Sequence, residues 1–138
     1  MIAYVDTSAL LRVVLREAGA LDDLRTYAGL VSSELITVES ARTIDRLRTQ
    51  GALTMDEAAE RIAVINDWLE AVDLVLLRPP VLNRACEPMP MSLGTLDAIH
   101  LATALLWRDR IGPLPQLVTH DAALGAAARG FGFDVRGI

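Results

Sequence analysis

The amino-acid sequence predicts a single α/β domain with a short parallel sheet of about four to five strands at its centre and helices on both faces. Three features of the chain support this prediction. Its 138 residues suit one domain over residues 1–138. Apolar residues make up 52% of the chain, which is enough for a packed core. Short apolar runs alternate with segments of helical spacing along the whole chain, as they do in folds with a central parallel sheet.

Five short apolar runs are expected to form the strands. Each is bounded by polar residues, glycine or proline, which is typical of a buried strand. The first run leads directly into Asp6, and the third ends before Pro79. Right-handed crossovers between parallel strands bring all their carboxyl ends to one edge of the sheet, where ligands bind. The strands are expected at residues 2–6, 30–32, 74–77, 116–119 and 133–136.

Six further segments have the spacing of helices. The first begins at Thr7 or Ser8, either of which suits the N-cap position, and ends before Gly19. Thr54 and Glu57 have the spacing of a capping box at the start of the third. Residues 87–92 are expected to form a loop. The helices are expected at about residues 8–17, 33–50, 55–72, 81–86, 96–107 and 121–129.

The chain has the features expected of a cytoplasmic protein without a membrane partner. No apolar run approaches the roughly 18 residues that a membrane span requires. Asp6 interrupts the N-terminal apolar stretch too early for a secretory signal. The single Cys86 cannot form an internal disulfide, which fits a reducing compartment.

The charge composition is unusual in that all 13 basic residues are arginine. The net charge of −5 is unfavourable for nucleic-acid binding, because domains that bind nucleic acid are usually basic. Arginine nevertheless pairs with phosphate through a planar fork of donors. The base composition of the genome is the preferred explanation for the absence of lysine. That absence still counts against phosphotransfer chemistry that relies on an ammonium group.

Four acidic residues are expected at the carboxyl edge of the sheet. Asp6 and Asp121 follow two strands, Asp97 lies in the first turn of a helix, and Glu39 lies about two turns into another. Taken singly, the aspartates suit helix starts, and Glu39 suits a solvated position or a pair with Arg42. Together they repel, by about 3 kcal/mol for a pair ~5 Å apart at an effective dielectric of ~20. A divalent cation would neutralise them, and oxygen ligands favour Mg²⁺ or Mn²⁺.

The acidic residues lie within four segments: MIAYVDTSALL, SSELITVESAR, TLDAIHLATAL and LVTHDAALGAAARGFGFDV. In this order, and over nearly the whole chain, the segments resemble the signature segments of PIN-domain ribonucleases. The resemblance is greatest to the VapC toxins of bacterial toxin–antitoxin pairs. It implies a single PIN-like domain that cleaves RNA with the help of Mg²⁺, with Mn²⁺ as a substitute.

The resemblance also implies a set of site residues. The glutamate of the set is Glu39 rather than its competitor Glu34, because Glu39 follows the residues TV within SSELITVE. The implied catalytic acids are Asp6, Glu39, Asp97 and Asp121. The three aspartates are the implied metal ligands, with Glu39 binding the metal directly or through water. The implied supporting hydroxyls belong to Thr7, Ser8 and Thr119. Between Thr119 and Asp121, where the family often has an aromatic residue, this chain has His120.

The resemblance implies three partners: an RNA substrate, a separate antitoxin protein that covers the active site, and a second copy of the chain in a homodimer. Candidate RNA contacts lie on two expected helix faces, one shared by Arg12 and Arg16, the other by Glu39, Arg42 and Arg46. These arginines suit solvated positions equally well. The two histidines are expected to have structural roles, with His100 packed in the core.

Two alternatives have a different function. A phosphotransfer or phosphatase-type α/β domain also places an aspartate after its first strand. Such domains normally use a lysine, which is absent, and the phosphatases have a second acid where this chain has Ser8. The other alternative is a non-catalytic acidic scaffold that binds a partner. A scaffold of this kind should have no saturable Mg²⁺ or Mn²⁺ site.

Overall fold

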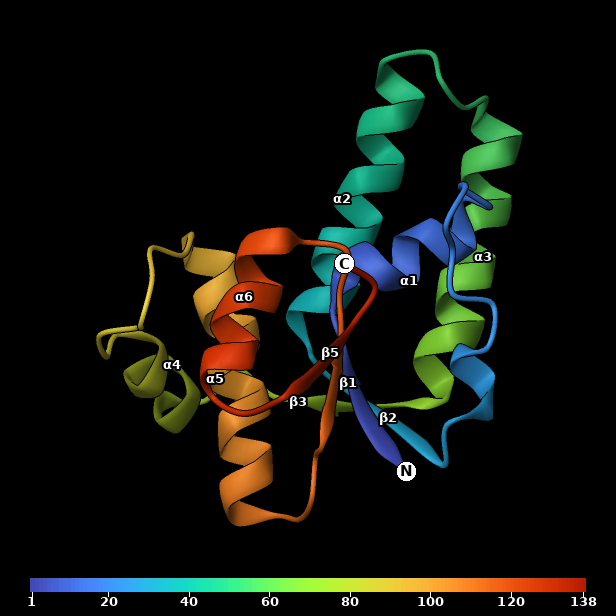
Figure 1. Cartoon of the computed structure of the whole chain (residues 1–138). Helices are drawn as coiled ribbons and strands as arrows, with labels where there is room; N and C mark the ends of the chain where they lie inside the picture. The colour runs from blue at the N-terminus through green and yellow to red at the C-terminus, as the bar shows by residue number, and fades with distance from the viewer.

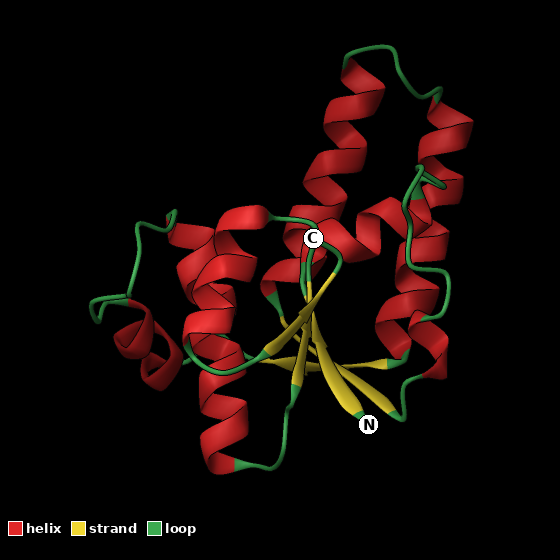
Figure 2. Cartoon of the chain, viewed as in Figure 1, coloured by secondary structure: helices red, strands yellow, loops and turns green.

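The centre of the molecule is a five-stranded sheet in which all neighbouring strands are parallel (Figures 1 and 2). The computed structural model describes all residues, 1–138. The strand order is β3-β2-β1-β4-β5, so β1 is the middle strand. The predicted fold class, including helices on both faces, is confirmed. The strands are β1 (Ile2–Val5), β2 (Gly29–Ser33), β3 (Val72–Val75), β4 (Gln116–Val118) and β5 (Asp134–Arg136).

Helices cover both faces of the sheet. Helices α1, α2 and α3 cover one face; α5 and α6 cover the other, with α4 packed against α5 (Figure 1). The antiparallel pair α2 and α3 extends well beyond the sheet. None of the helices combines the length and the apolar character needed to cross a bilayer. The helices are α1 (Thr7–Val14), α2 (Leu35–Thr49), α3 (Met55–Glu70), α4 (Pro79–Ala85), α5 (Thr95–Arg110) and α6 (Ala122–Gly130), with a 3₁₀ turn at Leu24–Thr26.

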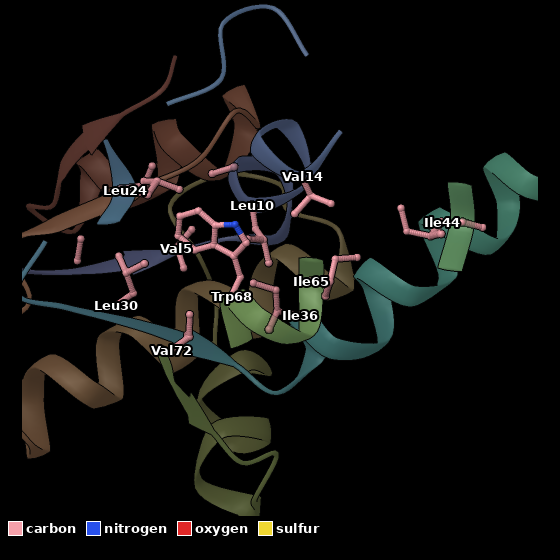
Figure 3. Close-up of a cluster of buried hydrophobic side chains, with 14 residues drawn as sticks. Val5, Leu10, Val14, Leu24, Leu30, Ile36, Ile44, Ile65, Trp68 and Val72 are labelled. Atoms are coloured by element: carbon pink, nitrogen blue, oxygen red, sulfur yellow. The ribbon is translucent and has the colours of Figure 1, made fainter. Parts of the chain in front are cut away.

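Successive side chains of β1 point to opposite faces of the sheet, and the core forms two clusters, one on each side. Ala3 and Val5 belong to the cluster under α1, α2 and α3, which contains Trp68 (Figure 3). Tyr4 points to the opposite side and belongs to the cluster under α5 and α6. All three side chains are buried almost completely. Burial on both faces explains why β1 has no charged residue before Asp6.

Some helices and strands begin or end at other residues than expected, where contacts between distant segments determine the boundary. The third strand was expected at 74–77 but forms at Val72–Val75, because Val72 pairs with Leu30 of β2. The helix before it therefore ends at Glu70. The fourth helix begins at Pro79 rather than residue 81, since proline fits the first helical position. The capping box formed by Thr54 and Glu57 is confirmed.

The first helix is capped by Asp6, and the expectation that Thr7 or Ser8 is the N-cap is wrong. The Asp6 carboxylate accepts a hydrogen bond from the backbone N–H of Ser8. The strand therefore passes into the helix without an intervening loop. The residue that follows the central strand is also the residue that starts α1.

The same helix ends at Val14 instead of reaching Glu17, because Arg16 adopts a left-handed conformation with φ of 56°. The N–H of Arg16 donates to the carbonyl of Val13 at 3.1 Å, and that of Glu17 donates to the carbonyl of Arg12 at 2.9 Å. These two bonds form a Schellman motif with Arg16 in the position usually taken by glycine. Arg12 and Arg16 therefore do not share a helix face, contrary to expectation.

We expect the substitution Arg16→Gly to raise the free energy of unfolding by about 0.5–1 kcal/mol. Glycine adopts a positive φ without the steric penalty of a Cβ atom, although it also makes the unfolded chain more flexible. Urea denaturation measures the change. The control Arg16→Ala removes the guanidinium group but keeps the Cβ atom, and it should not stabilise the protein. Equal stabilisation by both substitutions would show that the charge of Arg16 is unfavourable, and not its backbone conformation.

Candidate active site

Asp6 occupies the centre of the carboxyl edge, directly after the middle strand. Its backbone N–H donates to the carbonyl of Val118 at 3.0 Å, which extends the pairing of β1 with β4. Its carboxylate is buried and accepts hydrogen bonds from the N–H of Ser8, the hydroxyl of Ser8 (3.1 Å) and the hydroxyl of Thr119. Burial raises the pKa of Asp6, although the nearby His100 and these hydrogen bonds act in the opposite direction.

The hydroxyls that hold Asp6 also hold the turn between β4 and α6. The hydroxyl of Thr119 accepts a hydrogen bond from the N–H of Asp121 at 2.9 Å, and the hydroxyl of Ser8 accepts one from the N–H of His120 at 2.9 Å. The Asp121 carboxylate caps α6 by accepting from the N–H of Leu124 at 2.9 Å. Two turns that are more than a hundred residues apart in the chain are thereby joined.

The charge of Asp97 is destabilised by its surroundings. This half-buried side chain lies in the first turn of α5. Burial raises the pKa of Asp97 to about 6, and the negative charges of Asp121, Asp6 and Glu39 add to the effect. The other three predicted acids therefore lie within electrostatic range of Asp97. A pKa shifted by burial and by like charges is typical of a functional site.

The acids at this edge provide only oxygen donors, which suit hard cations such as Mg²⁺ and Mn²⁺. Asp6, Asp97 and Asp121 come from the ends of β1 and β4 and from the start of α5. No three or more His, Cys, Asp and Glu side chains form a ready-made coordinating group. The chemistry of the donor set therefore fits a divalent cation, while its side chains would need to move closer to bind one.

Glu39 joins this edge from the second turn of α2. Its Oε1 atom accepts hydrogen bonds from the hydroxyl of Thr7 at 2.8 Å and from Nε2 of His100 at 2.6 Å. Burial acts to raise the pKa of Glu39, but the neighbouring His100 and the hydrogen bond from Thr7 outweigh it, so the pKa lies below its ordinary value. Glu39 is therefore ionised at neutral pH.

The competing glutamate, Glu34, is used elsewhere in the fold. Its carboxylate accepts a hydrogen bond from the N–H of Leu77 at 2.8 Å, and its own N–H donates to the carbonyl of Val75 at 2.9 Å. These bonds connect the start of α2 with the end of β3. Of the two glutamates, only Glu39 acts on the charge of Asp97.

The candidate arginines lie on helices next to this edge and interact with residues of their own segments. Arg42 pairs with Asp45 at 3.1 Å, and Arg46 donates to the hydroxyl of Thr43 at 3.3 Å. Because α2 is continuous, Arg42 and Arg46 share a helix face with Glu39, as predicted. The guanidinium group of Arg12 lies 3.8 Å from the carboxylate of Glu17.

Sequence reasoning missed a link between Tyr4 and Glu39. His100 is buried, as expected of a core residue, but it also bridges these two side chains through its ring nitrogens. The available signal was its position one helical turn after Asp97. His120 bonds instead to the carbonyl oxygen of Gly137 through Nδ1, at 2.7 Å.

Comparison with known proteins gives the family. A family model described as the PIN domain matches residues 3–129. The chain belongs to the PIN-domain family. Its relatives in this family include ribonuclease VapC46 of Mycobacterium tuberculosis, 34% identical over 137 residues, with 96% of this chain and 94% of the relative covered. Ribonuclease VapC35 of the same species is 35% identical over 131 residues, with 91% and 88% covered.

Solved structures with the PIN-domain fold are similar over nearly their full length. A toxin–antitoxin complex from Klebsiella pneumoniae matches with a TM-score of 0.62 and 18% identity, covering 93% of both chains. VapBC2 from Rickettsia felis, bound to a DNA fragment from their promoter, matches with a TM-score of 0.66 and 11% identity, covering 99% of this chain and 98% of the other. At these identities the similarity shows the fold alone.

We expect Asp97→Asn to stabilise the PIN domain at pH 8 in the presence of EDTA. Folding raises the pKa of Asp97 from its ordinary value of 3.8 to about 6. The folded protein therefore loses stability as the pH rises through this range and Asp97 ionises. One pKa unit corresponds to about 1.4 kcal/mol, and partial exposure reduces the effect, so the expected gain is about 1 kcal/mol. The gain should disappear below pH 3.8.

Urea denaturation at several pH values measures this difference. The matched control is Asp22→Asn, because Asp22 is exposed and forms no ion pair. Its effect should be small at every pH. Destabilisation of Asp97→Asn at pH 8 would indicate that the Asp97 charge is favourable, as in an ordinary helix start.

Proposed function

We propose that this chain is a divalent-metal-dependent endoribonuclease, the toxin of a VapBC-type toxin–antitoxin pair. Membership of the PIN-domain family and similarity to relatives named as ribonucleases support the proposal. The single observation that carries it is the meeting of four carboxylates at the carboxyl edge of the sheet. Thr119 links Asp6 to Asp121, and burial and the charges of Asp121, Asp6 and Glu39 raise the pKa of Asp97. A structural helix start needs no such cluster of like charges.

Asp6, Asp97 and Asp121 would hold Mg²⁺, and Mn²⁺ would substitute for it. Glu39 would bind the ion directly or through water. A bound divalent cation supplies an activated water and stabilises the charge on the attacked phosphodiester. The absence of nitrogen and sulfur ligands among these four side chains favours the two hard cations over zinc.

The hydroxyl groups of the site orient its acids. Ser8 and Thr119 both donate to Oδ2 of Asp6, so they fix the rotation of this carboxylate. Thr7 donates to Glu39 in the same way at 2.8 Å. Groups held by hydrogen bonds need little rearrangement during a reaction, which is the physical basis of preorganisation.

The RNA would lie along the face of α2 that presents Glu39. Arg42 and Arg46 follow Glu39 at helical spacing on this face, and Arg12 lies on α1. Their guanidinium groups would contact RNA phosphates, which offsets the unfavourable net charge of −5.

The proposed protein partners are a separate antitoxin and a second copy of the chain. An arginine of the antitoxin would enter the carboxylate cluster and replace the charge of the metal, since arginine pairs with carboxylates in a bidentate geometry. We place the pair in the cytoplasm, where the single exposed Cys86 would stay reduced. Light scattering of the isolated chain tests the homodimer.

We expect the purified protein to cleave RNA in the presence of Mg²⁺ or Mn²⁺ and to lose this activity in EDTA. Asp97→Asn should reduce the cleavage rate by more than about 100-fold, because even residues that only support metal ligands contribute about 10- to 100-fold. The rate is measured by gel electrophoresis of total RNA and by a fluorogenic oligonucleotide.

The control is Asp109→Asn, at an exposed position near the other end of α5, which should retain activity. Mg²⁺ should raise the melting temperature of the wild type more than that of Asp97→Asn, because a ligand of the native state stabilises it. Equal shifts of the melting temperature in the two proteins would show that Asp97 is a helix-start residue and not a metal ligand. If the wild type had no saturable Mg²⁺ or Mn²⁺ site, the alternative of a non-catalytic acidic scaffold would be supported. Cleavage that resists EDTA would come from another nuclease.

We expect the cognate antitoxin to inhibit cleavage through arginines that reach the carboxylates. Replacing those arginines with alanine should weaken binding at least about 30-fold, because breaking a buried charge pair costs about 2 kcal/mol or more. Isothermal titration calorimetry measures the affinity, and residual cleavage measures the inhibition. Unchanged affinity and full inhibition without the arginines would refute this mode of inhibition, and would leave the nuclease activity unaffected.

A further inference from the structure

A buried chain of hydrogen bonds runs from the middle strand to Glu39. The hydroxyl of Tyr4 lies 2.7 Å from Nδ1 of His100, and Nε2 of His100 lies 2.6 Å from Oε1 of Glu39. Tyr4 is fully buried and His100 is 2% exposed. Their rings meet edge to face, with centroids 5.9 Å apart at an angle of 78°. The three side chains come from β1, α5 and α2, which belong to different layers of the fold.

A backbone contact favours one direction for this chain. The N–H of Ser33, on β2, donates to the hydroxyl oxygen of Tyr4 at 3.1 Å. A backbone N–H can only donate, so this oxygen accepts there. The hydroxyl keeps its own hydrogen as a donor, and Nδ1 of His100, 2.7 Å away, lies in position to accept it. Burial raises the pKa of Tyr4, so the hydroxyl keeps this hydrogen.

The direction of the first bond fixes the proton on the imidazole ring. In this direction Nδ1 of His100 accepts from Tyr4, and the single ring proton of a neutral histidine then lies on Nε2. Nε2 then donates to Oε1 of Glu39, a carboxylate oxygen that can only accept. Ser33, Tyr4, His100 and Glu39 thus form an unbroken sequence of donors and acceptors.

In this arrangement the two carboxylate oxygens of Glu39 differ in their hydrogen bonding. Oε1 accepts from His100 at 2.6 Å and from Thr7 at 2.8 Å, whereas Oε2 has no hydrogen-bond partner. Two donors on one oxygen restrict the rotation of the carboxylate. The free oxygen remains available to a metal-bound water or to the metal itself.

We propose that His100 is a positioning residue of the active site: as the Nε2–H tautomer selected by Tyr4, it anchors one oxygen of Glu39 and leaves the other free for the metal site. The inference rests on the proposed function and adds two residues to it. Histidines and carboxylates that hold metal-site ligands through hydrogen bonds act in this way in other proteins.

The tautomer is tested on the resting protein by ¹⁵N NMR in EDTA at neutral pH. The chain contains only two histidines, so the variant His120→Gln is enough to assign the signals. We expect His100 to carry its proton on Nε2 alone. A proton on Nδ1, or on both nitrogens, would overturn the selection of the tautomer by Tyr4.

The positioning role is tested by Mn²⁺ affinity and by steady-state kinetics. His100→Leu should lower both Mn²⁺ affinity and kcat by about 10- to 100-fold with little change in KM. His100→Gln, whose amide also donates, should restore most of the loss. In a Glu39→Gln background, His100→Leu should cause no further loss, because the two residues act through the same carboxylate.

The two tyrosines provide a matched pair of variants. Tyr4→Phe removes the hydroxyl that selects the tautomer and should lower kcat, although less than His100→Leu does. Tyr27→Phe removes a hydroxyl that bonds to Gln116 and Arg136, remote from Glu39, and should leave kcat and Mn²⁺ affinity unchanged.

Several results would overturn the inference. These are unchanged Mn²⁺ affinity and kcat in His100→Leu, equal losses in His100→Gln and His100→Leu, and losses that multiply in the double variant with Glu39→Gln. If such a result accompanies a wild type that binds Mn²⁺ and cleaves RNA, the inference fails alone. A wild type that does neither overturns the proposed function and the inference together.

Discussion

The buried carboxylate of Asp6 is the constraint on which the candidate site depends. A buried charge without partners is very unfavourable, and this one is satisfied from two directions, by Ser8 of its own turn and by Thr119 of the turn after β4. Satisfying Asp6 therefore requires the two turns to meet. Their meeting places Asp121 at the same edge, since the N–H of Asp121 donates to the Thr119 hydroxyl.

Much of the fold could be predicted because its signals are local. Apolar runs indicated the strands, and parallel pairing predicted that their carboxyl ends meet at one edge. The three aspartates could therefore be placed together. Choosing Glu39 over Glu34 needed the family resemblance, because both lie near the start of one helix. The hydrogen bond between Tyr4 and His100 could not be predicted from the sequence, because it joins residues 96 positions apart. The sequence offered Asp6, Thr7 and Ser8 as possible caps of the first helix, and the choice among three adjacent good caps needed the structure.

The carboxylate cluster illustrates how a candidate functional site can oppose the stability of the fold. Ionisation of Asp97 is unfavourable in the folded chain, because burial and three neighbouring charges disfavour it. The rest of the fold tolerates this cost through two well-packed cores on either side of the sheet. In this chain the proposed metal ligands are thus not the groups that would stabilise the fold most, which is a general trade-off at functional sites.

The strand order has a consequence for synthesis of the chain on the ribosome. The middle strand, β1, emerges first, yet its neighbour β4 is made more than a hundred residues later. The carboxyl edge therefore cannot be completed until most of the chain has left the exit tunnel, and contacts between distant segments form late in folding. A nascent or truncated chain lacks Asp121 and the Thr119 hydroxyl, and so it lacks a complete acidic centre. For a proposed toxin, this topology would delay harm to the translating cell until the protein is nearly finished.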